Sequence, residues 1–347
     1  MKNKIIVAPL NWGLGHASRC VPIIHFLVEN NFTPVIASDG NALELLQKEF
    51  PGLEFLDLPS YGISYAKNLK LGLLFQFPKV LRAIKNERKV IANYLEQDKE
   101  VVGIISDNRL GVRNSKIPSV YLTHQVNVLA GFVTFISSKI HQFYIKKFDE
   151  CWVPDTKDNL FSGALSKTNN QILGLKYIGV LSRFKKGNLP IINDVLILLS
   201  GIESQRKSLE DKLLSEFANY QGRVVVVQGL IENKQTIIET KGIKMYNYLL
   251  SSEVEKEIKQ SQIVVCRSGY SSIMDLAVLD KKAIFIPTPN QPEQEYLASY
   301  LEGKKMAPFS LQNELTKEKI KVVSNYKGLS SEKTLLDPDL LCLFKRK

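Results

Sequence analysis

Cysteine and histidine are both scarce in this chain of 347 residues, which contains four of each. The cysteines are scattered and none forms a Cys-x-x-Cys pair, so a disulfide framework or a zinc site is not expected. The histidines show no metal-ligand spacing, and we expect no metal and no cofactor. This cysteine usage is typical of a protein of the reducing cytoplasm.

Long hydrophobic runs are missing as well. No run approaches the length of a membrane span, and the first apolar run, Ile5–Leu10, is too short for the core of a signal peptide. We therefore expect a cytoplasmic protein.

Acidic residues are too few to balance the basic ones, and the net charge is +11. An anionic membrane surface, a diphosphate substrate and nucleic acid are possible partners, and a basic surface that only aids solubility is the alternative. The Lys and Arg residues are spread along the chain, so nucleic acid is the least expected partner. Basic residues flank the apolar stretch Leu71–Phe77, which is typical either of a helix lying on a membrane or of a core helix with a basic face.

The length predicts two domains, and a composition of 44% apolar and 23% charged residues is that of a globular protein. Alternating strand and helix patterns predict an α/β fold with parallel sheets. We expect one domain over residues 1–161, a linker over 162–190 and a second domain over 191–330. The tail 331–347 is basic at its end, and we expect it to return to the first domain.

The stretch 263–298 is the most informative part of the sequence. An apolar run ends at Arg267, a helical pattern follows, and a second apolar run leads into a proline-rich turn and another helix. Such β-α-β-α units contain strands that are buried on both faces, which explains the unbroken apolar runs.

Small polar residues stand where such a unit binds phosphates. Ser268, Gly269, Ser271 and Ser272 follow the first strand and open the helix, where free backbone N–H groups favour an anion. Asp275 lies further along the helix, where it can accept hydrogen bonds from a ribose. A serine-capped helix with a solvated aspartate is the alternative interpretation.

These residues resemble the donor-binding half of GT-B glycosyltransferases, in the family related to MurG. The family motif S-G-x-x-[ST]-x-x-[ED] reads Ser268-Gly-Tyr-Ser-Ser-Ile-Met-Asp275 here. The resemblance implies that this run binds the diphosphate and ribose of a UDP-sugar. It also implies that Gln294 and Glu295, where the family has two glutamines, contact the sugar hydroxyls.

A second glycine loop follows the first strand. Gly13-Leu-Gly15-His16 precedes a helix, and its spacing differs from the dinucleotide fingerprint G-x-G-x-x-G. The loop resembles the N-terminal glycine loop of the same family, which implies that Gly13 and Gly15 face the donor. His16 is our candidate for the general base, because an imidazole can take the proton of an attacking hydroxyl. A histidine that only hydrogen-bonds a phosphate or the loop is the alternative.

Further polar clusters follow other predicted strands, at the edge where parallel sheets bind ligands. Asp107, Asn108 and Arg109 follow one strand, and His124 and Gln125 follow the next. These five residues are candidates for the acceptor side, and each can equally be a loop-structuring residue. In the second half, Ser200 and Gly201 stand where the family has a Gly-Gly-Ser phosphate loop, although the sequence departs from that form.

The resemblance implies a GT-B fold with two Rossmann-like domains facing a cleft. It implies a metal-independent glycosyltransferase that moves a hexose or N-acetylhexosamine from a UDP-sugar to a hydroxyl, on a lipid-linked acceptor or a cell-envelope glycan. Such an enzyme would be cytoplasmic or peripheral on the inner face of the membrane. The alternatives are a UDP-sugar hydrolase or epimerase on the same fold, and a sugar-nucleotide-binding protein without catalysis.

Overall fold

The computed structural model describes residues 3–62, 69–129, 134–167, 174–240, 242–332 and 335–345. The chain forms two compact units, and each is built from pieces that are distant in the sequence. Unit 1 comprises Met1–Asn11, Arg19–Gly179 and Leu335–Lys347, whereas unit 2 comprises Trp12–Ser18 and Val180–Thr334.

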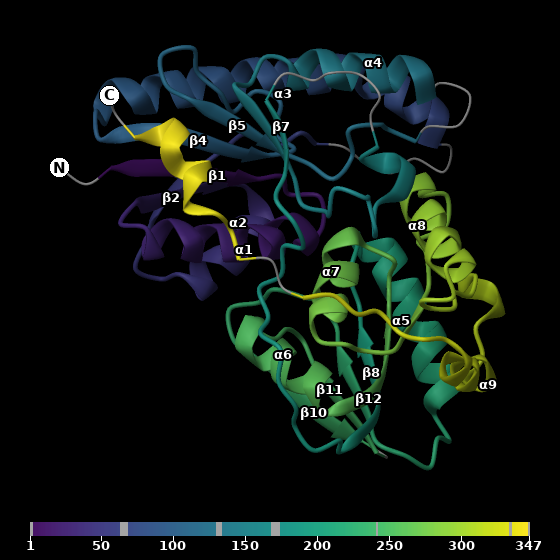
Figure 1. Ribbon diagram of the computed structural model, residues 1–347. Helices are drawn as coiled ribbons and strands as arrows, with labels where there is room; N and C mark the ends of the chain where they lie inside the picture. Colours follow the sequence, from purple (N-terminus) through teal and green to yellow (C-terminus); the bar gives the residue numbers. More distant parts are fainter. Residues whose placement is uncertain are drawn as a thin grey trace. The chain divides into compact units, whose positions relative to one another are not determined.

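The core of unit 1 is a parallel sheet with the strand order β3-β2-β1-β4-β5-β6-β7 (Figure 1). This order, which reverses direction between β1 and β4, is that of the Rossmann fold. The strands are β1 (Lys4–Pro9), β2 (Thr33–Ser38), β3 (Glu54–Asp57), β4 (Val101–Asp107), β5 (Ser119–Leu122), β6 (Glu150–Val153) and β7 (Leu175–Tyr177). The central strands are buried along most of their length because helices cover both faces.

Two pairs of helices cover this sheet. On one face, α3 (Leu69–Gln97) packs over β1, β2 and β4, and α4 (Thr134–Ile145) packs over β5 and β6. In Figure 1, α1 (Leu14–Glu29) and α2 (Gly40–Glu49) lie on the other side of the strands. The C-terminal tail also packs within this unit through the 3-10 segment η5 (Pro338–Phe344), where Phe344 lies against Gly103 and Trp152.

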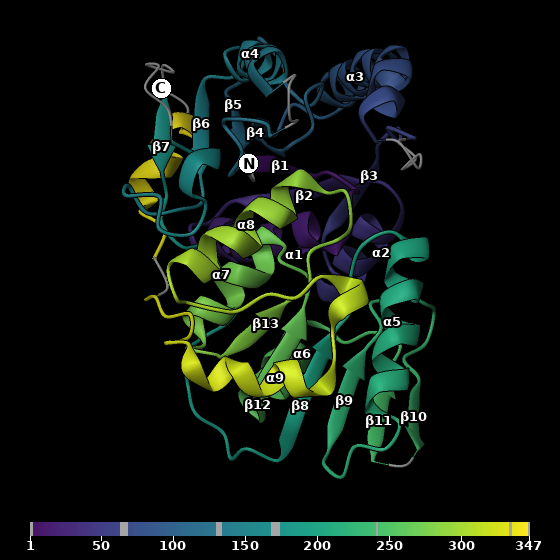
Figure 2. The same ribbon diagram turned by 90° about the vertical axis from the view of Figure 1, so that its right-hand side faces the viewer.

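Unit 2 contains a second sheet with the order β10-β11-β9-β8-β12-β13, in which only β10 is antiparallel to its neighbour (Figure 2). The strands are β8 (Asn193–Leu198), β9 (Val224–Val227), β10 (Ile237–Thr240), β11 (Ile243–Tyr246), β12 (Ser261–Cys266) and β13 (Ala283–Phe285). The helices are α5 (Glu203–Phe217), α6 (Ser251–Lys259), α7 (Tyr270–Val278), α8 (Pro292–Gly303) and the short α9 (Lys317–Ile320). Its core consists of Val, Ile, Leu and Phe side chains from the strands, from α5 and from the segment around α9.

The predicted β-α-β-α unit is present as β12, α7, β13 and α8, and the predicted α/β class is confirmed. Two elements differ from the expectation. Proline is disfavoured inside a helix, but α3 continues through Pro78, and its later turns are anchored by buried Ala83, Ile84 and Ile91. The β10–β11 hairpin was not predicted, because the β10 side chains are all exposed and give no alternating pattern.

The beginning of the basic stretch, residues 63–68, lies outside the described residues, as do the side chains of 69–77. Of the helices in the described part, none combines the length and the apolar character that a membrane span needs.

Candidate active site

The candidate residues follow the strands at which each sheet reverses its order. In unit 2 this point lies between β8 and β12, which pair in parallel with Leu198 opposite Cys266. Ser200 and Gly201 follow β8, and Ser268 and Gly269 follow β12. In unit 1, Asp107 ends β4 next to β1. Open α/β sheets bind ligands at such switch points.

The loop between β12 and α7 has the geometry of an anion site. Gly269 is the N-cap of α7, with an ordinary φ of −75°, and a Cβ atom added there would meet nothing within 4 Å. The first backbone N–H groups of the helix have no partner within the helix itself. The space beside Gly269 and the positive end of α7 therefore suit a phosphate group.

Hydrogen bonds gather the other donor-side candidates of unit 2 around this loop. Ser271 Oγ donates to the carbonyl of Gly15 at 2.8 Å, and Ser268 Oγ donates to the carbonyl of Gln294 at 2.8 Å. The Gln294 side chain accepts from the backbone of Thr288 at 2.8 Å, and Glu295 similarly accepts from the backbone of Asn290 at 3.0 Å. The glycine loop around Gly15, the loop between β12 and α7 (called the phosphate loop below for its proposed role) and the start of α8 thus lie together.

Arg267 contributes a buried positive charge directly before the phosphate loop. Its Nη1 donates to the carbonyls of Ile286 and Pro287 at 3.1 and 3.2 Å, and its Nη2 donates to Gln205 and Gln312 at 3.0 and 2.9 Å. All these acceptors are neutral, and burial lowers the pKa of Arg267 to about 10. A neighbouring diphosphate would supply the missing negative charge. Sequence reasoning missed this residue, although it precedes the S-G motif.

Asp275 is engaged inside unit 2, a placement that the sequence did not predict. Ser182 Oγ donates to its Oδ1 at 2.6 Å, and Arg183 Nε lies 3.4 Å from its Oδ2. Burial raises the pKa of this carboxyl, which the Arg183 charge and the Ser182 hydrogen bond oppose. The carboxylate thus anchors the segment that leads into β8, and a ribose would share it with these two residues.

The remaining donor-side candidates lie in loops and at a helix start. Gly13 and Gly201 have φ values of 78° and 104°, which favour glycine. His16 is half-buried in the first turn of α1 and belongs to unit 2 with Gly13 and Gly15. The structure therefore brings the candidate base into the same unit as the phosphate loop.

On the acceptor side, Asp107 is completely buried in an ion pair with Arg19. Arg19 donates through Nε to Asp107 Oδ2 at 3.0 Å and through Nη2 to Oδ1. Its Nη1 lies 2.7 Å from Nδ1 of His124. Because a guanidinium only donates, Nδ1 accepts, and a neutral His124 carries its proton on Nε2. Arg19 thus brings Asp107 and His124 together. Arg19 itself was not among the residues that the sequence analysis selected.

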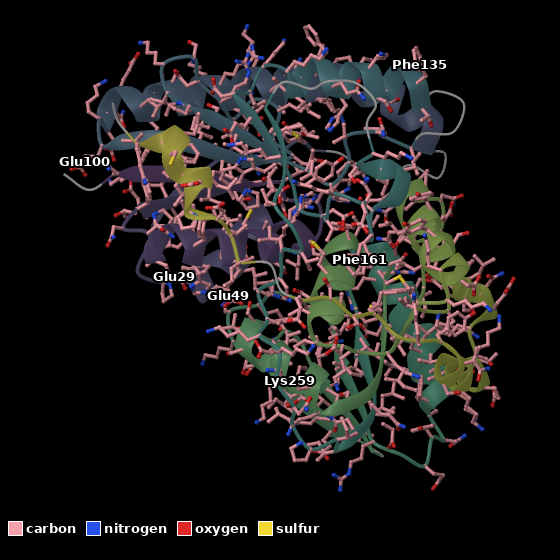
Figure 3. The ribbon with its side chains drawn as sticks, viewed as in Figure 1. Glu29, Glu49, Glu100, Phe135, Phe161 and Lys259 are labelled. Atoms are coloured by element: carbon pink, nitrogen blue, oxygen red, sulfur yellow. The ribbon has the colours of Figure 1, made fainter. Side chains whose placement is uncertain are left out.

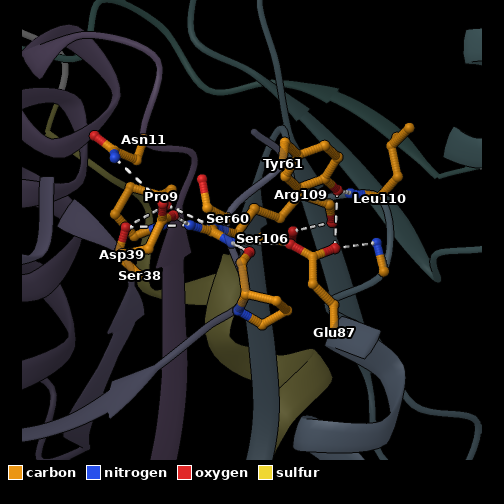
Figure 4. Close-up of polar contacts among 12 residues, drawn as sticks. Pro9, Asn11, Ser38, Asp39, Ser60, Tyr61, Glu87, Ser106, Arg109 and Leu110 are labelled. Atoms are coloured by element: carbon orange, nitrogen blue, oxygen red, sulfur yellow. Dashed lines mark hydrogen bonds and ion pairs between the residues drawn. The ribbon is translucent and has the colours of Figure 1, made fainter. Parts of the chain in front are cut away.

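Arg109 is completely enclosed in unit 1, in the network drawn in Figure 4. It forms ion pairs with Glu87 of α3, at 2.9 Å, and with Asp39 before α2, and it donates to the carbonyl of Pro9 at 2.8 Å. Tyr61 donates to the same Glu87 at 2.8 Å. Arg109 therefore ties the sheet to two helices.

Asn108 and Gln125 are held locally. Asn108 has a φ of 58° and accepts a hydrogen bond from the Tyr121 hydroxyl at 3.0 Å. The backbone N–H of Gln125 donates to Thr123 Oγ1 at 3.0 Å. Among the residues that the structure describes, no three His, Cys, Asp or Glu side chains gather as a metal site requires.

Comparisons with known proteins agree with this geometry. Residues 197–333 match the model of the Glycosyltransferase family 28 C-terminal domain. The UDP-N-acetylglucosamine--N-acetylmuramyl-(pentapeptide) pyrophosphoryl-undecaprenol N-acetylglucosamine transferase of Buchnera aphidicola subsp. Schizaphis graminum (strain Sg) is 24% identical, over 97% of this chain and 92% of that protein.

Two solved structures share the fold. The glycotransferase of kitacinnamycin superposes with a TM-score of 0.63 and 14% identity, over 99% of this chain and 93% of that one. MurG of Acinetobacter baumannii superposes with a TM-score of 0.51 and 13% identity, over 94% and 93%.

The two switch-point sheets and these superpositions define a protein with the GT-B fold. With the family 28 C-terminal domain over residues 197–333 and a curated glycosyltransferase relative that matches 97% of the chain, the chain is a glycosyltransferase. It is similar to MurG in its fold.

Proposed function

We propose that this enzyme transfers a hexose or N-acetylhexosamine from a UDP-sugar to a hydroxyl of a lipid-linked or cell-envelope acceptor. The observation that carries the proposal is the open position beside Gly269 at the start of α7, inside the family 28 region. The relative in Buchnera is named for a UDP-sugar donor and an undecaprenol-linked acceptor, which supports the same classes here.

In the proposed reaction the acceptor oxygen attacks the anomeric carbon of the sugar. The bond from that carbon to the diphosphate breaks, the nucleoside diphosphate leaves with the electron pair, and His16 takes the proton of the hydroxyl. The leaving group gains negative charge, which the α7 N-terminus and the buried charge of Arg267 would stabilise. These groups are the reason why we propose that no metal is needed.

The binding contacts follow from the same placement. Gly269, Ser271 and Ser272 would surround the diphosphate, together with Ser200 and Gly201 after β8. Gln294 and Glu295 would face the sugar after exchanging their present backbone partners Thr288 and Asn290. We propose Asp107, Asn108 and His124 as acceptor-side residues, and a cytoplasmic location with contact to the inner face of the membrane.

The first experiment is calorimetry with UDP, ADP and GDP on the wild type and on Gly269→Ala. A methyl group at residue 269 meets no protein atom, so folding stability should not fall. The same methyl group should crowd a bound diphosphate and weaken UDP binding at least tenfold. Gly303→Ala at the end of α8 also meets nothing within 4 Å and is the matched control, which should bind UDP normally. Equal UDP binding by all three proteins would remove the phosphate loop from the proposal.

The second experiment measures turnover of UDP-sugars with and without a lipid-linked acceptor. His16→Ala should bind UDP normally and lose about 100-fold or more in turnover, as expected for a general base. His25→Ala, an exposed histidine of the same helix, is the control. Normal turnover of His16→Ala would exclude His16 as the base. UDP release at the same rate with and without the acceptor would favour a hydrolase.

A further inference from the structure

A second cationic site lies in unit 1, in the seam between α3 and α4. The segment that follows β4 runs along this seam. Its Leu110 packs with the cluster under α4, and its Val112 packs with the cluster under α3. Arg113 comes next, and its Nη1 donates to the carbonyl of Lys147, just after α4, at 3.4 Å. Both helices lie on the same face of the sheet in Figures 1 and 2.

Three cations lie at this seam. Arg88 stands on α3 between the buried Ile84 and Ile91, and Ile91 packs in the same cluster as Val112, the residue before Arg113. Lys147 is the third, and its carbonyl accepts from Arg113. Burial and repulsion by Arg88 lower the pKa of Arg113. Burial and repulsion by both arginines lower the pKa of Lys147. Like charges therefore disfavour the charged forms of Arg113 and Lys147 at this place.

The protein provides little compensation for these charges. The Nε atoms of Arg88 and Arg113 are buried and have no hydrogen-bond partner in the described part of the chain. Among the described residues, Asp149 is the carboxylate that attracts Arg113, and it already accepts from the backbone of Ser119 at 2.7 Å. Lys147 Nζ lies 4.0 Å from the centre of the Phe143 ring and 4.9 Å from that of Tyr144, so aromatic faces hold it rather than an acid.

The two guanidinium groups and the ammonium group together favour an anionic ligand with several oxygen atoms. Guanidinium groups bind the oxygens of a phosphate through two parallel hydrogen bonds, and an ammonium adds a compact charge. Three positive charges against one carboxylate leave a net excess that a dianion would neutralise. We propose that Arg88, Arg113 and Lys147 form a binding site for a phosphate group, either of a soluble phosphate ester or of a lipid headgroup.

This site does not depend on the proposed donor site. Arg113 precedes β5 and Lys147 precedes β6, so both lie toward the amino ends of strands, whereas the candidate catalytic residues follow the carboxyl ends. Phe143 beside Lys147 is 58% exposed, and Phe135 at the other end of α4 is 72% exposed and points away from the sheet in Figure 3. These exposed rings are the reason to test a lipid source beside a soluble one.

The first arm uses inorganic phosphate as the probe in thermal unfolding, with chloride at matched ionic strength as the reference. All variants carry Gly269→Ala, so that phosphate binding at the proposed donor loop does not contribute. Phosphate should stabilise the parent, and Arg88→Gln/Arg113→Gln should weaken phosphate affinity about tenfold or more. Lys146→Gln, an exposed neighbour of Lys147, is the matched control and should respond like the parent.

The chloride reference separates binding from a structural role. In chloride, Arg113→Gln should be at least as stable as the parent because it removes repulsion, and in phosphate this order should reverse. Equal loss of stability in both buffers, or an unchanged phosphate response of the double variant without any vesicle effect, would overturn the proposal.

The second arm uses vesicles of phosphatidylglycerol, with phosphatidylcholine vesicles as the uncharged reference. Weaker sedimentation of Arg88→Gln/Arg113→Gln with phosphatidylglycerol, but not of Lys146→Gln, assigns the site to a headgroup. Phosphate binding that is lost in the double variant while vesicle binding stays the same assigns it to a soluble ester.

Discussion

Asp275 has a structural role in the fold and a proposed role in ribose binding. Its carboxylate holds Ser182 and Arg183, and the family resemblance places a ribose contact at the same position. The two roles make different predictions, because an anchor supports folding and a ribose contact supports binding.

Asp275→Ala should lower the free energy of unfolding by about 1–3 kcal/mol, because it leaves the Ser182 hydroxyl and the Arg183 charge without their partner. If Asp275 also holds the ribose, UDP binding measured by calorimetry should weaken in the same variant. Asp211→Ala, whose side chain is 61% exposed in a surface ion pair with Lys207, should change stability by less than about 1 kcal/mol. A destabilised Asp275→Ala with normal UDP affinity would leave only the anchoring role.

His141 should make the enzyme sensitive to acid. Burial lowers the pKa of its imidazole to about 4, from the ordinary 6.5 that the unfolded chain would have, and the neighbouring His124 lowers it further. Between pH 6.5 and 4 the unfolded chain therefore binds a proton that the folded protein does not. The stability contribution is complete above pH 6.5 and falls as the pH decreases toward 4.

Urea unfolding at pH 7, 6 and 5 tests this expectation. His141→Gln should show a pH dependence that is smaller than that of the wild type by up to about 1.4 kcal/mol per pH unit. His25→Gln, which replaces an exposed histidine, should keep the wild-type slope. Parallel slopes for the wild type and His141→Gln would show that this imidazole titrates normally.

At the scale of elements, the Arg109 network decides how α2 and α3 are attached to the sheet. Arg109 and Glu87 are both 0% exposed, so neither can exchange its partner for water. Arg109→Met should destabilise the protein by about 3–5 kcal/mol, because it leaves the buried Glu87 carboxylate uncompensated.

A double-mutant cycle in urea checks this claim. Adding Glu87→Met to Arg109→Met should recover part of the loss, because the unpaired charge is removed with its partner. Lys207→Met breaks the exposed pair with Asp211 and should cost about 0.5 kcal/mol or less. Additive losses in the cycle would mean that Arg109 and Glu87 act independently.

The elements also show what the sequence could and could not predict. Strands such as β12 were predictable because buried parallel strands are continuous apolar runs, and the loops after them carry the candidate residues. The helix α3 was harder, because Pro78 argues against a continuous helix while its buried face lies further on. The hairpin β10–β11 could not be predicted, because all β10 side chains are exposed and the strand therefore lacks the alternation of apolar and polar residues.

In the candidate site, positions were predictable and partners were not. Ser268, Gly269 and His16 could be placed because each follows a strand and opens a helix. The partners of Asp275 and Arg109 come from residues distant in the sequence, Ser182 and Glu87, and no local pattern encodes such a meeting. The sequence alone could not tell whether Arg109 faces a ligand or the protein interior.

At the scale of the whole molecule, unit 1 depends on the end of the chain. Phe344 is 1% exposed, packs against Gly103, and has its ring 6.4 Å from that of Trp152. Phe344→Ala should therefore destabilise unit 1 by about 3–5 kcal/mol. Calorimetric unfolding should show the loss, whereas UDP binding by unit 2 should persist at temperatures where unit 1 remains folded.

Leu335→Ala is the matched control, because Leu335 belongs to the same tail but is 86% exposed. It should change stability by no more than about 0.5 kcal/mol. If Phe344→Ala unfolds like the wild type, as Leu335→Ala is expected to do, the packing of Phe344 does not stabilise unit 1.

The return of the tail also sets the timing of folding during synthesis. Domains usually fold in the order in which they are made, with the N-terminal one first. Here the position beside Gly103 is filled only after the ribosome has made all of unit 2 and then Phe344, so a polypeptide stalled before Phe344 exposes part of the interior of unit 1. Stop codons between Thr334 and Phe344 should therefore yield products that cellular proteases recognise, even though the strands of both sheets have been made.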